Sequence, residues 1–320
     1  MKLGWIYDRR FLQHDTGPTH IEQAGRLDAI VRALGAAGLS ERLRPLAFCA
    51  ATAEQLALVH DPAYVDLVRM MCAEGFTFIG SQDTVICPRS YDVAALAAGG
   101  VLAACDAVMS QLVPRAFCAV RPPGHHAESD RALGFCLFNH VALAAEHLIR
   151  HDGLKRVAVV DIDAHHGNGT QRIFESRRDV FYVSLHERPA SLPFPGTGEA
   201  EETGCGAGRG STLNVPLDAG AGDRQYRDAF QQHVLPALDS YRPEFLVVSA
   251  GFDALMWDPA AHLSLEPASF GWITELLVRT AERHAGGRLV SVLEGGYCLS
   301  HLGAAAVAHV RALLAAADDH

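Results

Sequence analysis

The stretch "VAVVDIDAHHGNGTQ", residues 157–171, joins an apolar strand to a group of charged and ionisable side chains. Four apolar β-formers run directly into Asp161, Asp163, His165 and His166. Burying a charge costs free energy unless the charge is paired or bound to a metal, and paired histidines are rarely needed for packing. The sequence therefore predicts a functional site, and most simply a metal site, at the end of this strand.

Similar apolar runs recur along the chain and predict further strands. They are continuous rather than alternating, as expected for strands covered on both faces. They lie at "LGWIYD" near residue 5, 116–120, 157–163, 180–186, 212–217, 245–253 and 289–297. Helical patterns fall between most of them, at 90–111, 139–151, 223–240, 266–285 and 300–317. Ser90 and Ser300 stand at the starts of two of these helices, and we expect Ser90 to cap the first.

The alternation of strands and helices predicts an α/β fold with three layers, α/β/α, around a central and mostly parallel sheet. No linker rich in Pro, Gly or Ser divides the chain, so a single catalytic domain is expected over residues 1–320. Three polar segments, roughly 8–25, 75–90 and 186–211, are too long to be simple connections. They are candidates for loops that cover a site or meet a neighbouring subunit, and the oligomeric state is left open.

Composition excludes several classes of protein. The formal net charge is −10 and no cluster of Lys and Arg occurs, which argues against a nucleic-acid binder and is compatible with cationic substrates. The eight cysteines form no CxxC pair and are expected to be reduced. "MKLGWIYDRR" does not resemble a signal peptide, and no apolar stretch approaches the roughly 18 residues of a membrane span. A cytoplasmic location and no membrane partner are expected.

A divalent metal ion is the simplest reason for the polar strand ends. In open parallel sheets, sites form outside the carboxyl ends of the strands. Asp161 and Asp163 are two apart and predicted to point to the same side of the strand. Asp163 and His165 can reach one ion, and Asp253, after "VVSAGF", is the candidate third ligand. Carboxylate oxygen with imidazole nitrogen suits Zn²⁺, or Fe²⁺, with an open position for water.

The adjacent histidines of "RPPGHHA" are candidates for general acid–base catalysis beside such a metal. Each imidazole needs a partner that fixes its tautomer, and Asp161 and Asn168 are available. A carboxylate favours imidazolium, whereas an amide leaves its histidine closer to neutral, so His125 and His126 would differ in charge.

Tyr297 follows two glycines in "EGGYC", and glycine lets the backbone pass close to a ligand. Taken alone, a strand-end tyrosine is as well explained by packing, and an Asp-x-Asp-x-His segment by capping of a strand end. The convergence of Tyr297 with the histidines and aspartates at one sheet edge favours a site.

The residues together resemble the histone deacetylase family, in the arginase/deacetylase fold. The matching segments follow the family's order from residue 121 to 297: "RPPGHHA", "GFCLFN", "DIDAHHGNGTQ", "SLH", "FPGTG", "NVPL", "SAGFDA" and "EGGY". Upstream, "HIEQAGRL" resembles the family's His-x-Glu…Arg-Leu segment, and "QDT" at 82–84 its rim aspartate. Asn168 is similar to the class II-like and bacterial branch, since class I members carry aspartate there.

The resemblance implies a role for each matching residue. It implies one Zn²⁺ per chain on Asp163, His165 and Asp253, with His125, His126, Asp161, Asn168 and Tyr297 as catalytic residues. It also implies a narrow substrate channel and a K⁺ or Na⁺ ion. The channel residues would be Asp83, Gly134, Phe135 and Phe194, with Arg26 beneath the site near an acetate exit, and the monovalent ion would lie near Asp161, Asp163, His165, Ser184 and Leu185.

The activity implied is a zinc-dependent amidohydrolase that removes acyl groups from the ε-amine of lysine in a peptide or protein, or from a similar alkyl amine. An acetylpolyamine deacetylase is the alternative. Ala260 stands where some polyamine-selective relatives carry a glutamate, which weakens that alternative without excluding it. His140 departs from the asparagine of many relatives and is expected to affect packing or the wall of the site.

Two remoter alternatives are open. An arginase-like ureohydrolase would bind two Mn²⁺ ions through a D-A-H-x-D pattern, but Gly167 replaces the second aspartate. A non-catalytic acyl-lysine binder would be expected to lack a metal ligand, the histidine pair or Tyr297, and all of these are present.

Overall fold

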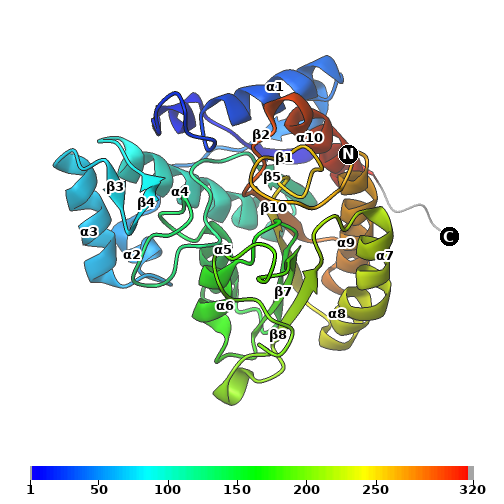
Figure 1. Cartoon of the computed structure of the whole chain (residues 1–320). Helices are drawn as coiled ribbons and strands as arrows, with labels where there is room; N and C mark the ends of the chain where they lie inside the picture. The colour runs from blue at the N-terminus through cyan, green and yellow to red at the C-terminus, as the bar shows by residue number, and fades with distance from the viewer. Residues whose placement is uncertain (1, 316–320) are drawn as a thin grey trace.

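The computed structural model describes residues 2–315. Its centre is an eight-stranded sheet with the strand order β2-β1-β5-β10-β9-β6-β7-β8, in which every neighbouring pair is parallel (Figure 1). The expected α/β architecture is thus confirmed. The strands are β1 Leu3–Ile6, β2 Leu43–Pro45, β5 Arg115–Cys118, β6 Val157–Asp161, β7 Val180–Glu187, β8 Thr212–Leu217, β9 Phe245–Ala250 and β10 Leu289–Leu293.

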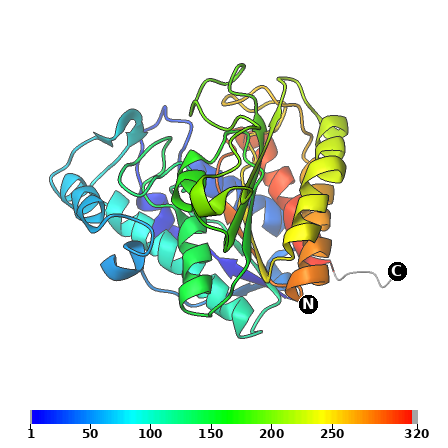
Figure 2. The same ribbon diagram turned by 90° about the horizontal axis from the view of Figure 1, so that it is seen from below.

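Helices cover both faces of this sheet, as the view of Figure 2 shows. One face is covered by α4 Ser90–Met109, α5 His140–Arg150 and α6 Asn168–Phe174. The other layer contains α1 Gly25–Ala36, α7 Asp223–Ala229, α8 Leu235–Tyr241, α9 Ser269–Ala285 and α10 Leu299–Leu314. The strands are buried between these layers, which explains why their sequences are continuously apolar.

A smaller unit packs on α4 at the side of the molecule drawn in light blue and cyan (Figure 1). It consists of α2 Ala53–Leu56, α3 Pro62–Ala73 and an antiparallel hairpin of β3 Phe78–Ile79 and β4 Ser81–Val85. The segment 75–90, expected to be a long loop, therefore contains a hairpin, because Phe78 and Val85 pair across it. This unit brings Asp83 toward the edge of the sheet where the site lies.

Strand β6 ends at Asp161, two residues earlier than expected. The backbone N–H of Asp163 donates to Asp161 Oδ1 at 3.1 Å, so the chain turns around the Asp161 carboxylate. The expectation that Asp161 and Asp163 share a face of one strand is therefore wrong. Strands β9 and β10 likewise end at Ala250 and Leu293, before the polar residues that follow them.

The expected cap of the first helix is also wrong. Arg89 is the N-cap residue of α4, and its side chain makes no capping hydrogen bond. Ser90 is the first helical residue, and its hydroxyl accepts from the backbone N–H of Cys87 at 2.8 Å and lies 2.7 Å from His14 Nδ1. Ser90 is buried, so its hydroxyl serves tertiary contacts rather than its own helix end.

Two other predicted helices differ in detail. The helix expected at 223–240 contains a π-helical segment, Phe230–Val234, between α7 and α8. Pro236 follows at the start of α8, and its missing N–H and bulky ring favour a wider turn just before it. The helix expected at 300–317 runs from Leu299 to Leu314, and residues 316–317 lie outside the described residues.

Within the described chain, α4 is long and apolar enough to cross a membrane by length and composition. However, 78% of its apolar window is buried inside the fold. It packs against β1, β5 and β10, so it serves here as a core helix.

Candidate active site

Four neighbouring strands deliver the predicted site residues to one edge of the sheet. In spatial order these strands are β5, β10, β9 and β6. The chain after β5 carries His125 and His126, and the chain after β10 carries Tyr297. The chain after β9 carries Asp253, and β6 ends in the "DIDAHH" segment. Because all four strands are parallel, their carboxyl ends meet, as the sequence predicts.

The three predicted metal ligands lie together. His165 Nδ1 lies 2.9 Å from Asp253 Oδ2 and 3.2 Å from Asp163 Oδ1. One donor atom from each residue lies within 4.8 Å of the others. Both aspartates are buried, and the His165 side chain is 13% exposed.

Backbone amides and glycines hold these carboxylates in place. The N–H of Gly295 donates to Asp163 Oδ2, and that of Ala164 donates to Asp253 Oδ1, each at 2.8 Å. A Cβ at Gly295 would lie 2.5 Å from Asp253 Oδ2 and 2.6 Å from Asp163 Oδ2, so the two carboxylates fill the space that a side chain would take.

Burial and the charge of Asp163 raise the pKa of Asp253 to about 7. Two buried carboxylates with one imidazole are a donor set that suits a divalent cation of the first transition row.

The two histidines of "RPPGHHA" lie beside this trio, with ring centroids 3.9 Å apart. His125 Nδ1 lies 3.0 Å from Asp161 Oδ2, and His126 Nδ1 lies 2.8 Å from Asn168 Oδ1. The predicted partners are therefore in contact. Burial opposes a charge on His125, but the nearby carboxylates, chiefly Asp161, outweigh it and raise its pKa to about 10.

Burial, together with the nearby imidazoles of His125 and His165, lowers the pKa of His126 well below its ordinary value. The adjacent histidines thus carry different charge, as their unequal partners predict.

Two buried glutamates that the sequence analysis did not identify support this pair. Glu294 Oε2 accepts from the backbone N–H groups of Gly124 at 2.7 Å and His125 at 3.1 Å, which fixes the loop that carries the histidines. Glu128 Oε1 accepts from Asn168 Nδ2 at 2.9 Å, which leaves the amide oxygen of Asn168 for His126. Glu294 directly precedes the glycines of "EGGY", but nothing in its local sequence indicates a contact 170 residues away.

Tyr297 also lines the site, together with His126 and His165. Asp258, which the sequence analysis also missed, accepts from the backbone N–H groups of Tyr297 at 2.6 Å and Cys298 at 2.9 Å. The Arg26 guanidinium lies 4.8 Å from the Tyr297 ring centroid, and Arg26 Nε donates to the carbonyl of Gly296 at 2.7 Å. Burial raises the pKa of Tyr297 well above its ordinary value, so the phenol keeps its proton and can donate.

A cavity of about 250 Å³ leads to these groups from the surface. All four predicted channel residues line it. The lining consists of Ile21, Asp83, His126, Gly134, Phe135, His165, Leu192, Phe194, Ala260 and Tyr297. Ile21 and Leu192 were not predicted, because neither side chain carries a chemical signal in the sequence.

The backbone at the aromatic wall of the cavity has unusual dihedral angles. Gly134 and Phe135 both have positive φ, +54° and +68°. The Phe135 ring packs edge-on against Tyr297, with centroids 5.8 Å apart, and Phe194 packs against His126 at 4.9 Å. His20, another residue without a predicted role, contacts the Phe135 ring at 4.8 Å.

His20 also contacts a second lining residue, since its Nε2 lies 3.1 Å from the backbone oxygen of Asp83. The Asp83 carboxylate accepts from the Ser81 hydroxyl. His140 does not line the cavity: it is buried, and its Nε2 lies 3.0 Å from the carbonyl of Pro122. Of the two outcomes expected for His140, packing is therefore the correct one.

The predicted monovalent-cation residues also lie near one another. Asp161 of β6 pairs with Ser184 of β7 in the sheet, and Leu185 follows Ser184. The Ser184 hydroxyl lies 2.8 Å from His186 Nδ1.

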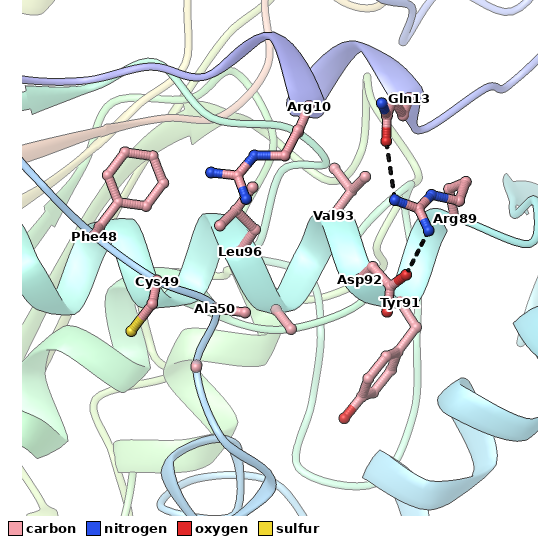
Figure 3. Close-up of a pocket in the computed structure, with 12 residues that line it drawn as sticks. Arg10, Gln13, Phe48, Cys49, Ala50, Arg89, Tyr91, Asp92, Val93 and Leu96 are labelled. Carbon is pink, nitrogen blue, oxygen red and sulfur yellow. Dashed lines mark hydrogen bonds and ion pairs between the residues drawn. The ribbon is translucent and has the colours of Figure 1, made fainter.

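A larger cavity, of about 410 Å³, lies between the segment that contains Arg10 and helix α4 (Figure 3). Both arginines in its wall are paired: Arg10 with Asp8 at 2.7 Å and Arg89 with Asp92 at 3.1 Å. The cavity does not include the metal trio, so we place the candidate active site in the smaller cavity.

Comparisons with known proteins agree with this geometry. A model of the histone deacetylase domain matches residues 20–313. The chain is 43% identical to the histone deacetylase-like amidohydrolase of Pseudomonas aeruginosa, over 92% of this chain and 75% of that protein. It is 38% identical to a probable deacetylase of Archaeoglobus fulgidus, over 93% of this chain and 82% of that protein.

It is also 39% identical to the human polyamine deacetylase HDAC10, over 94% of this chain but 45% of that protein. The crystal structure of the HDA15 HD domain superposes with a TM-score of 0.93 at 37% identity, covering 98% of this chain and 90% of the other. The chain therefore belongs to the histone deacetylase family and is a deacetylase.

Proposed function

We propose that the protein is a zinc-dependent amidohydrolase that removes acetyl or similar acyl groups from the ε-amine of lysine or from a comparable alkyl amine. The observation that carries this proposal is the trio of Asp163, His165 and Asp253, with donor atoms within 4.8 Å, beside a histidine pair. His165 of the trio and His126 of the pair line the cavity. Zn²⁺ is proposed as the ion, with Fe²⁺ as the alternative, because both suit mixed carboxylate and imidazole donors.

A divalent cation on this trio would supply Lewis acidity toward water and the amide carbonyl. The protein supplies the proton transfers. Asn168 Oδ1 accepts from Nδ1 of His126, so Nε2 of His126 is the basic nitrogen and can take a proton from the attacking water. His125, paired with the Asp161 carboxylate, is held as imidazolium next to it.

The departing amine needs a proton, and the developing negative charge on the carbonyl oxygen needs a donor. The histidine pair can return a proton to the amine nitrogen. The protonated phenol of Tyr297, at the cavity wall, is the candidate donor to the oxygen. Asp258 and Arg26 hold Tyr297 from its backbone and ring sides, so they are positioning residues.

The cavity suits a long, thin substrate. Phe135 and Phe194 supply apolar walls for an alkyl chain, and Gly134 leaves the space between them. Asp83 is the acidic residue at the mouth and can hold a backbone N–H or a second amine.

The alternative substrate is an acetylated polyamine, and two observations support this substrate class. One relative is named a polyamine deacetylase, and Asp83 adds an acidic side chain to the cavity lining that could bind a distal ammonium group. Ala260 in the lining offers no second carboxylate there. Comparing kcat/KM for an acetyl-lysine peptide with that for acetylputrescine and acetylspermidine separates the two substrate classes.

Removal of the metal tests whether the protein is a metal-dependent hydrolase. Chelation should abolish turnover, and one equivalent of Zn²⁺ per chain should restore it. Asp253→Asn should lose both the tightly held ion and turnover, whereas Asp239→Asn, at an exposed ion pair on α8, should keep both. Full turnover by the metal-free protein would contradict the proposal.

The remaining expectations are proposals of the same kind. A K⁺ or Na⁺ ion is proposed near Asp161 and Ser184, and Arg26 is proposed to lie near an acetate exit. A single domain, a cytoplasmic location and the absence of nucleic-acid partners are likewise proposed, from the sequence alone.

A further inference from the structure

A second cluster of metal-binding side chains lies away from the cavity, where α4 meets the end of α5. Its members are Asp106 on α4 and His147, His151 and Asp152 at the end of α5. One donor atom from each of the four residues lies within 4.8 Å of the others. No role for these residues emerges from the sequence motifs or from the site described above.

The two histidines are arranged as a chelating pair. They are four residues apart, and His151 continues the helical backbone as the C-cap of α5. Their rings are nearly parallel, at 9°, with centroids 4.8 Å apart. Two histidines at this spacing face the same side of a helix, an arrangement that binds Zn²⁺ in other proteins.

The carboxylates complete the cluster from two directions. Asp106 Oδ1 lies 2.7 Å from His147 Nε2, and this hydrogen bond lowers the pKa of Asp106, so that its carboxylate is ionised at neutral pH. Asp152 Oδ1 lies 3.5 Å from His151 Nδ1. Asp152 Oδ2 is buried and finds no hydrogen-bond partner among residues 2–315. A buried carboxylate oxygen without a donor costs free energy, which a cation would offset.

This cluster is separate from the candidate active site. Helix α5 begins at His140, beneath the "RPPGHHA" loop, and the cluster is at its other end. Eleven helical residues span about 16 Å at 1.5 Å per residue. Strand β6 starts after the cluster and returns to the site at Asp161, so the cluster belongs to the amino-terminal edge of the sheet.

We propose that Asp106, His147, His151 and Asp152 form a second metal site, which binds a divalent ion of the Zn²⁺ class and ties α4 to α5. Tetrahedral ligand atoms at about 2.1 Å from a metal lie about 3.4 Å from one another. The donor atoms of the four residues lie within 4.8 Å of one another, so they must move somewhat closer to bind one ion. Asp106 and His151 are 55% and 68% exposed, so both can rotate to close that gap. Imidazole nitrogen with carboxylate oxygen favours Zn²⁺, Ni²⁺ or Co²⁺ over Mg²⁺ or Ca²⁺.

The competing explanation is an ordinary histidine–aspartate ion pair on the surface. The chain contains a matched example, because His284 Nε2 lies 2.7 Å from Asp239 Oδ1, the same distance as in the His147–Asp106 pair. There Arg283 shares the carboxylate in place of a second histidine. Replacing His284, whose side chain is 13% exposed, therefore removes one imidazole and one ion pair without touching the proposed site.

The test uses the untagged chain loaded with one equivalent of Zn²⁺ and desalted. Calorimetric titration with Zn²⁺ is compared among the wild type, His151→Asn, Asp106→Asn and the control His284→Asn. A second, weaker equivalent is expected in the wild type and in His284→Asn, and at least a tenfold loss of its affinity in the other two. Retention on a Ni²⁺ chelating resin should follow the same order, and deacetylation of an acetyl-lysine peptide should be equal in all four.

Because His151 and Asp106 are exposed, both variants are expected to fold, which a thermal melt checks. A wild type without a second equivalent overturns the proposal. So does a second equivalent that survives unchanged in His151→Asn and Asp106→Asn, or one that is lost in His284→Asn as well.

Discussion

His126 Nδ1 lies 2.8 Å from the amide oxygen of Asn168, and Asn168 is itself held by Glu128. This neutral partner fixes the tautomer of His126 without adding a charge. The neighbouring His125 faces the carboxylate of Asp161 instead. The Asp161 carboxylate raises the pKa of His125, whereas burial and the neighbouring imidazoles lower that of His126 and Asn168 adds no charge to oppose them. The first prediction rests on this difference.

Asn168→Asp should raise the pKa of His126, because a carboxylate stabilises the imidazolium form by about 1–3 pKa units. His126 must be neutral to act as the base, so the acidic limb of the profile of kcat/KM against pH should move upward. Asn168→Ala is the control, since it removes the partner without adding a charge. Glu128 Oε1 lies 2.9 Å from Asn168 Nδ2, so Asn168→Asp is also made together with Glu128→Gln to keep the new carboxylate ionised. An acidic limb that stays in place in both variants would exclude His126 as the base.

Tyr297→Phe should lower kcat by about 10²–10³-fold, the usual loss for one donor to a developing oxyanion. Its zinc content should be unchanged, because the ring contacts with Phe135 and Arg26 do not need the hydroxyl. Metal analysis and steady-state kinetics on the same preparation check this. Wild-type kcat in the variant would remove Tyr297 from the mechanism.

Gly134→Ala should abolish turnover by closing the channel. A Cβ at residue 134 would lie 2.5 Å from His126 Cδ2 and 2.8 Å from Phe194 Cζ, with φ at +54°. Gly38 provides the matched control, because its φ is +71° and no atom of residues 2–315 lies within 4 Å of its Cβ position. Both variants should lose about 1–3 kcal/mol of stability from the backbone strain, but Gly38→Ala should keep its activity. Equal kcat/KM in the two variants would mean that Gly134 does not shape the channel.

His309 should make the stability of the fold depend on pH. It is buried, with Nδ1 2.6 Å from the Thr274 hydroxyl and Nε2 2.8 Å from the Ser291 hydroxyl, and burial lowers its pKa to about 3. The unfolded chain takes up this proton below about pH 6.5, whereas the folded chain does not. The contribution of His309 to the free energy of unfolding is therefore fully present above about pH 6.5. It decreases as the pH drops toward 3.

One such histidine lowers the free energy of unfolding by about 1.4 kcal/mol for each pH unit of acidification in this range. Urea unfolding of the wild type and His309→Gln at pH 7.5, 6 and 5 measures it. The variant should be less stable at pH 7.5 but lose less stability on acidification. Parallel curves for the two proteins would contradict the assignment of a neutral, buried His309.

Much of the fold could be predicted from the sequence, because β-strands buried on both faces have continuous apolar sequences. The seven predicted strands correspond to β1, β5, β6, β7, β8, β9 and β10. The edge strand β2 and the helices α1 and α3 were missed. Strand β2 has only three residues, whereas α3 does carry a start signal in Asp61 and Pro62 that the prediction did not use. Ser90 was misassigned because a serine hydroxyl serves a helix cap or a tertiary contact equally well, and only the position of His14 decides between them.

The chemistry of the site was carried by the sequence itself. Aspartates and histidines gathered at the ends of parallel strands predicted a metal trio beside a histidine pair, and the resemblance to the histone deacetylase family added the channel wall and the role of Tyr297. What only the tertiary structure decided is the support around them. Glu294, Glu128 and Asp258 reach partners 39–170 residues away through contacts that local sequence does not encode. The cluster at Asp106 and His147 likewise exists only because α4 packs against α5. This packing brings two residues that are 41 positions apart in the sequence within hydrogen-bond distance.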